Sequence, residues 1–172
     1  NIIQCLVAAI FVIIALITDY KEYKIKNRSV LVFLIAGFVL NAATQGLTGA
    51  LDSIYGLFVP LILFPLFALN MLGAGDIKAL CAIGSIVGLR MSIYTMLFSL
   101  IAGGVIALGF MVFRRNAMER AKKLLEYIKH CFYAGRLLPY DHFTDQKSGF
   151  RFSLGISGGL ITTIVLSQIF GL

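Results

Sequence analysis

Two aspartates stand at the borders of long apolar stretches, where acidic residues are uncommon. Asp19 follows an apolar run in the stretch ALITDYKEYKIKN, and Asp76 precedes another in NMLGAGDIKAL. Two carboxyl groups within a few ångströms of each other cannot both ionise comfortably, so one keeps its proton and the pair provides a general acid and a general base. Such a pair can deprotonate a water for attack on an amide carbonyl and protonate the leaving nitrogen. We therefore expect Asp19 and Asp76 to form a hydrolytic site.

The residues just before Asp76 suit a closely approaching substrate. Gly73 and Gly75 lack Cβ atoms, so the backbone can turn sharply and a substrate strand can come near it. An extended peptide beside such a loop can form main-chain hydrogen bonds with it. We expect both glycines to contact the substrate.

Each acid also has a purely structural interpretation. Asp19 could simply end a helix at the lipid headgroups, and Asp76 could be the N-cap of the helix that follows. The pattern G-x-G-D is short and has low specificity by itself. Its value rises because a second acid is expected at the same membrane depth, where ionisable groups are costly and are functional candidates by default.

The composition indicates an integral membrane protein. Of the 172 residues 59% are hydrophobic and only 13% are charged, and the mean hydropathy is +0.92. Soluble domains are roughly 45–50% apolar and about 25% charged. Because one membrane-spanning helix takes about 20 residues, we expect an all-α fold of six spans in a single transmembrane domain, residues 1–172.

Six apolar runs are candidate spans. They are Ile2–Thr18, Val30–Gln45, Ile54–Leu72, Ile77–Leu89, Ile93–Phe113 and Phe152–Phe170. We interpret the first as a retained span and not as a cleaved signal peptide. The fourth covers only about 20 Å of a hydrocarbon core about 30 Å thick, so Asp76 just before it is expected partly at membrane depth. Prolines at 60 and 65 predict a bend in the third, and small residues such as Gly84, Gly103 and Gly155 predict close helix packing.

The basic residues fall on one side of these spans. Of 15 Lys and Arg, four lie between Lys21 and Arg28, one is Lys78, and nine lie between Arg114 and Arg151, which leaves only Arg90 for the other connections. Because cytoplasmic loops carry the excess of Lys and Arg, both termini and the linker Ala43–Ser53 are predicted outside the cell. Both acids then lie at the cytoplasmic edge.

The long basic segment 114–151 contains apolar residues at helical spacing. They are Met118, Ala121, Leu125, Ile128 and Phe132, with basic residues on the opposite face. We predict an amphipathic helix on the inner leaflet, where cations meet anionic membrane lipid. A cytosolic extension of span five is the alternative. In either case the basic residues do not indicate nucleic-acid binding.

No metal or cofactor site is expected. Cys5, Cys81 and Cys131 are scattered, and His130 and His142 stand alone in the basic segment. Neither set has the spacing of metal ligands, and a pair of aspartates can activate water without zinc.

These residues resemble the motifs of the type IV prepilin peptidases, a family of aspartic proteases that act at the membrane edge and carry a G-x-G-D motif. GAGDIKAL is similar to the second aspartate motif of that family, in which a Lys two residues after the Asp is usual, as Lys78 is here. DYKEYKIKN is similar to the first motif, an Asp followed by basic residues and then Ile-Pro-Asn. Ile25 and Asn27 stand at the expected positions, whereas Lys26 replaces the proline. The six-span layout is similar too, so the resemblance covers nearly the whole chain.

The resemblance implies an aspartic endopeptidase with Asp19 and Asp76 as catalytic residues, and it adds Lys78 to Gly73 and Gly75 as a candidate for substrate binding. The implied partners are prepilins or pseudopilins with a hydrophobic N-terminal helix and a short basic leader, cleaved at the cytoplasmic face of a bacterial cytoplasmic membrane. Longer members carry paired C-x-x-C motifs linked to N-methylation. The sequence contains no such pair and resembles the short, protease-only form.

Two other function classes use these residues differently. A small proton- or ion-coupled transporter could bind its ion at Asp19 and Asp76, although such a path usually has further polar groups deeper in the bilayer. A scaffold for a secretion complex would need neither acid for chemistry. Cleavage of a prepilin by the solubilised protein distinguishes the peptidase from both. The sequence indicates no particular oligomeric state.

Overall fold

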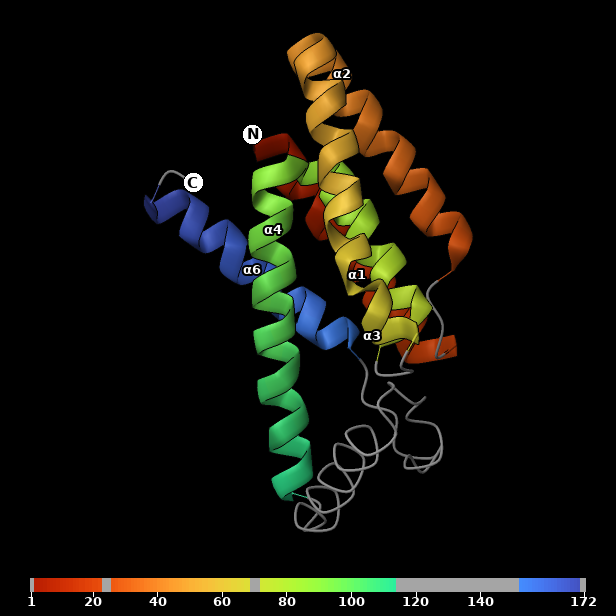
Figure 1. Cartoon of the computed structure of the whole chain (residues 1–172), viewed down its shortest axis with the longest axis vertical. Coiled ribbons are helices and arrows are strands. Elements are labelled where there is room, and N and C mark those ends of the chain that lie inside the picture. Colours follow the sequence, from red (N-terminus) through yellow and green to blue (C-terminus); the bar gives the residue numbers. More distant parts are fainter. Residues whose placement is uncertain (1, 23–25, 69–71, 114–151, 171–172) are drawn as a thin grey trace, which may run out of the picture.

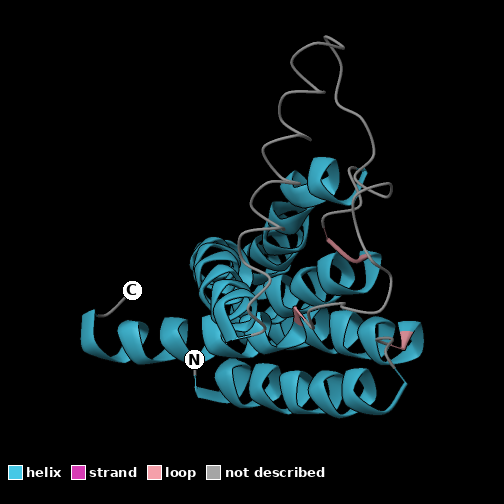
Figure 2. Ribbon diagram, turned by 90° about the horizontal axis from the view of Figure 1, so that it is seen from below, coloured by secondary structure: helices cyan, strands magenta, loops and turns pink. Residues whose placement is uncertain are grey.

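The computed structural model describes residues 2–22, 26–68, 72–113 and 152–170, and all of its regular structure in these ranges is helical (Figures 1 and 2). The elements are α1 (Ile2–Glu22), α2 (Asn27–Phe58), the 3-10 helix η1 (Val59–Leu63), α3 (Phe64–Ala68), α4 (Ala74–Phe113) and α6 (Ser153–Phe170). The all-α prediction is confirmed for the described residues.

Helix α2 folds back on itself at Gly46, which has φ 64° and ψ −141°. Asn41 and Ser53 lie on opposite sides of this glycine, yet both donate to the carbonyl oxygen of Ser85, at 2.9 Å and 2.6 Å. A straight helix would separate Asn41 from Ser53 by about 18 Å, so they can share one acceptor only because the helix reverses. Figure 1 shows the two arms of α2, in orange and gold, meeting at the top of the molecule.

Helix α4 reverses in the same way at Gly88, which has φ 83° and ψ 177°. Gly84 and Ser92 lie on opposite sides of Gly88 and both meet the carbonyl oxygen of Gly56. The Ser92 hydroxyl donates to this oxygen at 2.8 Å, and a Cβ on Gly84 would overlap it. The arms of α2 and α4 therefore pack at backbone contact, as the small residues predict.

The two reversals correct two predicted span boundaries. We expected a linker at Ala43–Ser53, but only Gly46 leaves the helical conformation there. Likewise, α4 passes through the expected gap between Leu89 and Ile93 as helix. A single glycine with positive φ turns the chain, so a run of polar loop residues is not needed.

Among the described residues, three helices are long and apolar enough to cross a membrane. They are Ile2–Lys21, Asn27–Ala68 and Ala74–Gly109, and Ser153–Ile169 is a shorter apolar helix. The count of six spans, which takes each arm of α2 and α4 as one span, stays a prediction. The amphipathic helix predicted over 118–132 lies outside the described residues.

The two prolines that predict a bend lie where α2 ends. The chain passes from α2 into η1, which has Pro60 near its start, and then into α3, which contains Pro65. Proline has no N–H group and its ring crowds the preceding turn, so regular α-helical bonding stops here.

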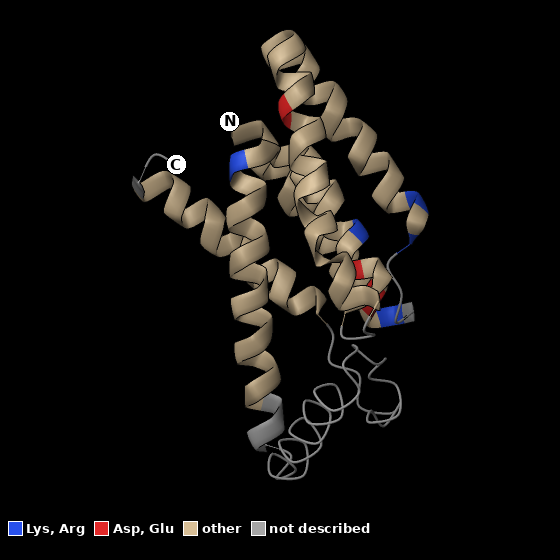
Figure 3. Cartoon of the chain, viewed as in Figure 1, with Lys and Arg blue, Asp and Glu red and all other residues tan. Residues whose placement is uncertain are grey.

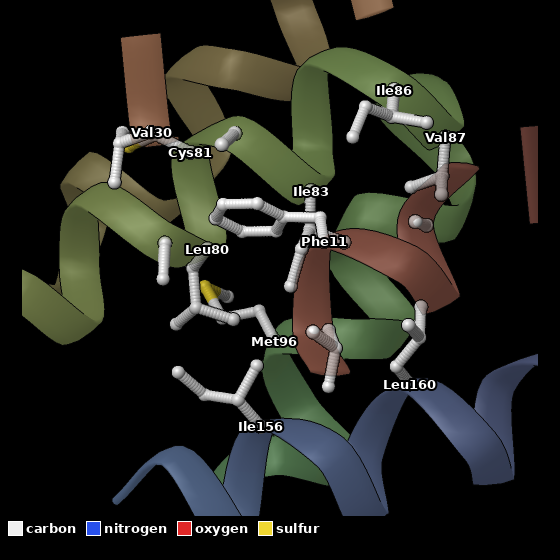
Figure 4. Packing of buried hydrophobic residues seen from close by; sticks show 14 of the residues in the cluster. Phe11, Val30, Leu80, Cys81, Ile83, Ile86, Val87, Met96, Ile156 and Leu160 are labelled. Carbon is white, nitrogen blue, oxygen red and sulfur yellow. The ribbon is translucent and has the colours of Figure 1, made fainter. Parts of the chain in front are cut away.

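The first arm of α4 is the centre of the bundle. Every residue from Ala79 to Gly88 is buried, as expected of a helix that is apolar all round. Figure 4 shows Phe11 of α1 beside Leu80 and Ile83 of this arm, and α6 adds its own buried residues to the same cluster. This arm is the short fourth span of the prediction, and it is enclosed by protein.

The outer faces of the surrounding helices are apolar. Along α1, large hydrophobic side chains are exposed at helical spacing, namely Ile2, Leu6, Ile10, Ile13 and Ile17. A continuous apolar face of this kind is unfavourable in water and is typical of an interaction or membrane surface. Together with the long apolar helices, it favours a membrane protein.

Candidate active site

Asp19 lies in the last turn of α1. Its side chain is half-buried, and its Oδ2 atom accepts a hydrogen bond from the hydroxyl of Ser153, 2.5 Å away, at the start of α6. Helix α1 continues past Asp19 to Glu22. Asp19 therefore does not end the helix, and its carboxyl turns inward to another helix instead of outward to solvent.

Asp76 lies in the first turn of α4, as the third helical residue. The carbonyl oxygen of Gly73 accepts hydrogen bonds from the N–H groups of Asp76 and Ile77, at 3.1 Å and 3.4 Å, so Gly73 holds the position just before the helix. The Asp76 carboxyl in turn accepts a hydrogen bond from the N–H of Gly73. This is one half of a capping box, in which the side chain of the third helical residue bonds back to the N–H of the residue before the helix. Asp76 is thus not the N-cap residue itself, although it does help to close the helix start.

The fold brings the two acids together. The carboxyl of Asp19 is close enough to that of Asp76 for a direct electrostatic interaction between them. Figure 3 shows the acidic segments of α1 and α4 at the same end of the bundle, together with most of the basic residues in the described ranges. The contact of Phe11 with the first arm of α4 keeps α1 and α4 in this register.

Gly73 and Gly75 differ in their surroundings. A Cβ on Gly73 would lie 2.9 Å from Oδ2 of Asp76. Any residue other than glycine at position 73 would therefore push the Asp76 carboxyl out of place. Gly75 is an ordinary residue of the first turn of α4. In the described ranges only Gly46 and Gly88 have positive φ, so neither Gly73 nor Gly75 adopts a backbone conformation that requires glycine, and contact of these two glycines with substrate stays a prediction.

Lys78 is exposed on α4, and its ammonium donates a hydrogen bond to Oδ1 of Asn27, at 3.2 Å. Asn27 is the first residue of α2 and belongs to the stretch that follows Asp19. The structure therefore joins the two sequence motifs by a side-chain contact in addition to the pair of acids.

Ser153 is the site residue that the sequence analysis missed. It stands at the start of the last apolar run, in RFSLGISGG, at the same predicted membrane edge as the two acids. The predicted topology was enough to place it at that edge. Nothing in the local pattern indicated contact with Asp19, because serines are common at helix starts.

The site consists of two neighbouring carboxyls, a hydroxyl donor and a helix start at which Gly73 and Gly75 carry no side chain. Among the described residues, no three His, Cys, Asp or Glu side chains are grouped as metal ligands would be. Cys131, His130 and His142 lie outside those ranges. The described groups are suited to moving protons to and from a water and an amide.

Comparison with protein families gives one match. Residues 6–108, more than half of the chain, match the model described as the type IV leader peptidase family. This range contains both acids as well as Gly73, Gly75 and Lys78, whereas Ser153 lies beyond it. No curated protein and no solved structure matches the chain.

Proposed function

The chain belongs to the type IV leader peptidase family, a family of proteases, and on that premise we propose that it is a membrane-embedded aspartic endopeptidase. Its catalytic residues are Asp19 and Asp76, and its substrates are prepilins or pseudopilins that carry a short basic leader peptide. The observation that carries the proposal is that these two acids, from helices far apart in the sequence, lie at one end of the bundle and interact electrostatically.

The reaction needs one ionised and one protonated carboxyl. The ionised carboxyl accepts a proton from water while the water oxygen attacks the scissile carbonyl, and the protonated carboxyl then gives its proton to the leaving nitrogen as the C–N bond breaks. Two like charges so close together disfavour double ionisation, which supplies the required mixed state. Because the two carboxyls titrate as a coupled pair, the single proton belongs to the pair and is not assigned to one aspartate.

The start of α4 supports binding of an extended leader junction. Gly73 and Gly75 present little side-chain bulk beside Asp76, so a substrate backbone can approach the carboxyl closely. Lys78, two residues after Asp76 on α4, remains a candidate for substrate binding, although its ammonium is engaged with Asn27. The hydrophobic helix of the substrate would stay among lipid, against apolar faces such as that of α1.

The distribution of charge supports the cytoplasmic side of a bacterial cytoplasmic membrane as the place of cleavage. The end of α1 and the beginning of α2, next to the acids, carry exposed Lys21, Lys26 and Arg28. Loops with such an excess of cations face the cytoplasm. In this orientation both termini face outward, and the chain is multi-pass.

The direct test is incubation of the detergent-solubilised protein with a prepilin from the same genome, followed by mass spectrometry of the product. We expect a shortened pilin that lacks its basic leader, and no product with Asp76→Asn. Prepilin that stays intact in detergent and in lipid vesicles would contradict the proposal. A membrane protein that moved protons or ions without cleaving prepilin would instead be a transporter.

A further inference from the structure

Ser153 contacts a catalytic candidate and lies outside the part of the chain that matches the family. Its hydroxyl donates to Oδ2 of Asp19 across 134 positions of sequence, and the serine is only 4% exposed. We propose that Ser153 is a positioning residue for Asp19, holding one carboxyl oxygen so that the other remains available for proton transfer with water and substrate. This inference rests on the proposed function.

The hydroxyl of Ser153 is not used to close its own helix. The first turn of α6 is closed by the backbone, where the N–H of Ile156 donates to the carbonyl oxygen of Phe152 at 3.0 Å. Ser157, one turn later, shows the local alternative, since its hydroxyl donates to the carbonyl oxygen of Leu154 at 2.8 Å. Ser153 instead reaches across to α1, which is the behaviour of a side chain that orients another.

Close packing of α6 on the second arm of α4 fixes where Ser153 lies. A Cβ on Gly155 would lie 2.8 Å from the Cα of Gly103, and a Cβ on Gly159 would overlap Ser99. The ring of Phe152 fills the space over Gly103, where a Cβ would lie 2.6 Å from the ring. Because of these three close contacts with α4, the start of α6 has little freedom to move away from Asp19.

The rate of an enzyme-catalysed reaction depends strongly on the orientation of its reacting groups. A misplacement of about 1 Å costs on the order of 100-fold, and a carboxyl on a single flexible side chain can rotate that far. In the buried setting of Ser153, water has poor access to take the place of the lost hydroxyl. Loss of Ser153 should therefore lower kcat and leave substrate binding nearly unchanged.

The test compares Ser153→Ala, Ser153→Thr and the matched control Ser157→Ala in the prepilin cleavage assay. We expect Ser153→Ala to lower kcat by roughly 10- to 100-fold with KM within about twofold of the parent. Ser153→Thr, which keeps the hydroxyl, should cleave faster than Ser153→Ala. Ser157→Ala removes a hydroxyl from the same helix without touching Asp19 and should match the parent.

Several results would overturn the proposal. They are full kcat in Ser153→Ala, a loss confined to KM, or equal activity in the Thr and Ala variants. If Ser153→Ala does not accumulate, Ser153→Cys keeps the side-chain size with a much weaker donor, and parent-like activity in that variant also counts against the proposal. Asp19→Asn separates the two proposals. Activity in Asp19→Asn refutes the aspartic mechanism, whereas inactive Asp19→Asn with fully active Ser153→Ala refutes only the role of Ser153.

Discussion

The ammonium of Lys78 donates a hydrogen bond to Oδ1 of Asn27, at 3.2 Å, and so ties the start of α4 to the start of α2. Asn27 follows the segment that leaves Asp19, and Lys78 follows Asp76 by two residues. Each motif thus supplies one acid and one partner of this hydrogen bond. The hydrogen bond lies at the same end of the bundle as the two acids.

If the Lys78–Asn27 hydrogen bond serves mainly to hold the starts of α2 and α4 together, removing either partner should have the same effect on activity. Lys78→Met and Asn27→Ala should each lower kcat/KM by about threefold, as expected for the loss of one partly exposed hydrogen bond. The double variant should be no worse than either single one. A much larger effect of Lys78→Met, additive with Asn27→Ala, would show that Lys78 acts on the substrate directly.

The acids should be individually essential. Asp19→Asn and Asp76→Asn should each lower kcat at least about 1000-fold, because an amide can neither donate nor accept the proton as a carboxyl does. Asp52→Asn is a matched control. Asp52 lies beside the reversal of α4 at Gly88, where it accepts a hydrogen bond from the N–H of Leu89 at 3.1 Å, and an Asn side chain can still accept this bond. Cleavage rates and membrane accumulation of the three variants provide the measurement. Near-parental activity in either of the first two would remove that residue from the mechanism.

Bulk at Gly73 should impair catalysis without removing a titrating group. In Gly73→Ala the new Cβ lies 2.9 Å from Oδ2 of Asp76, so the carboxyl must shift. We expect kcat to fall roughly 10-fold, within the range expected for a small misplacement of a reacting group. Gly104→Ala, also on α4 and with nothing within 4 Å of the new atom, should leave cleavage unchanged. Equal activities in the two variants would mean that Asp76 tolerates the shift.

The two reversals should differ in their tolerance of alanine. Gly46 and Gly88 both have positive φ, which costs an L-residue about 1–3 kcal/mol. A Cβ at Gly46 meets nothing within 4 Å, whereas at Gly88 it would overlap the Asp52 carboxylate. Gly46→Ala should therefore lower the free energy of unfolding by the backbone cost alone. Gly88→Ala should lower it by clearly more, because the clash with Asp52 adds to that cost. Unfolding in detergent measures both, and equal losses would show that Asp52 moves aside freely.

Labelling of single cysteines tests the orientation. In a chain with Cys5, Cys81 and Cys131 replaced, Thr48→Cys should react with an impermeant maleimide added outside intact cells, and Arg28→Cys should react only after lysis. Both positions are exposed. Arg28 lies near the start of the first arm of α2, which is about 30 Å long, and Thr48 lies just past the reversal at the other end of that arm. The reverse pattern would place the acids outside and exclude cytoplasmic leader cleavage.

The sequence by itself predicted a membrane protein with an all-helical fold and singled out the two acids of the candidate site. Long apolar runs leave helices as the structures that satisfy every backbone group in lipid. Asp19 and Asp76 stand out because acids are costly beside such runs. The same local reasoning placed loops where the structure has reversals at Gly46 and Gly88, because periodicity does not reveal that one glycine with positive φ will turn a continuous helix.

Only the tertiary structure decided which residues meet. The distance between the two acids depends on how α1 packs on the central arm of α4, and this packing involves side chains far apart in the sequence. Ser153 reaches Asp19 because glycines on α4 and α6 allow the backbones to touch. Such contacts depend on the shapes of two helices at once, so neither helix encodes them alone.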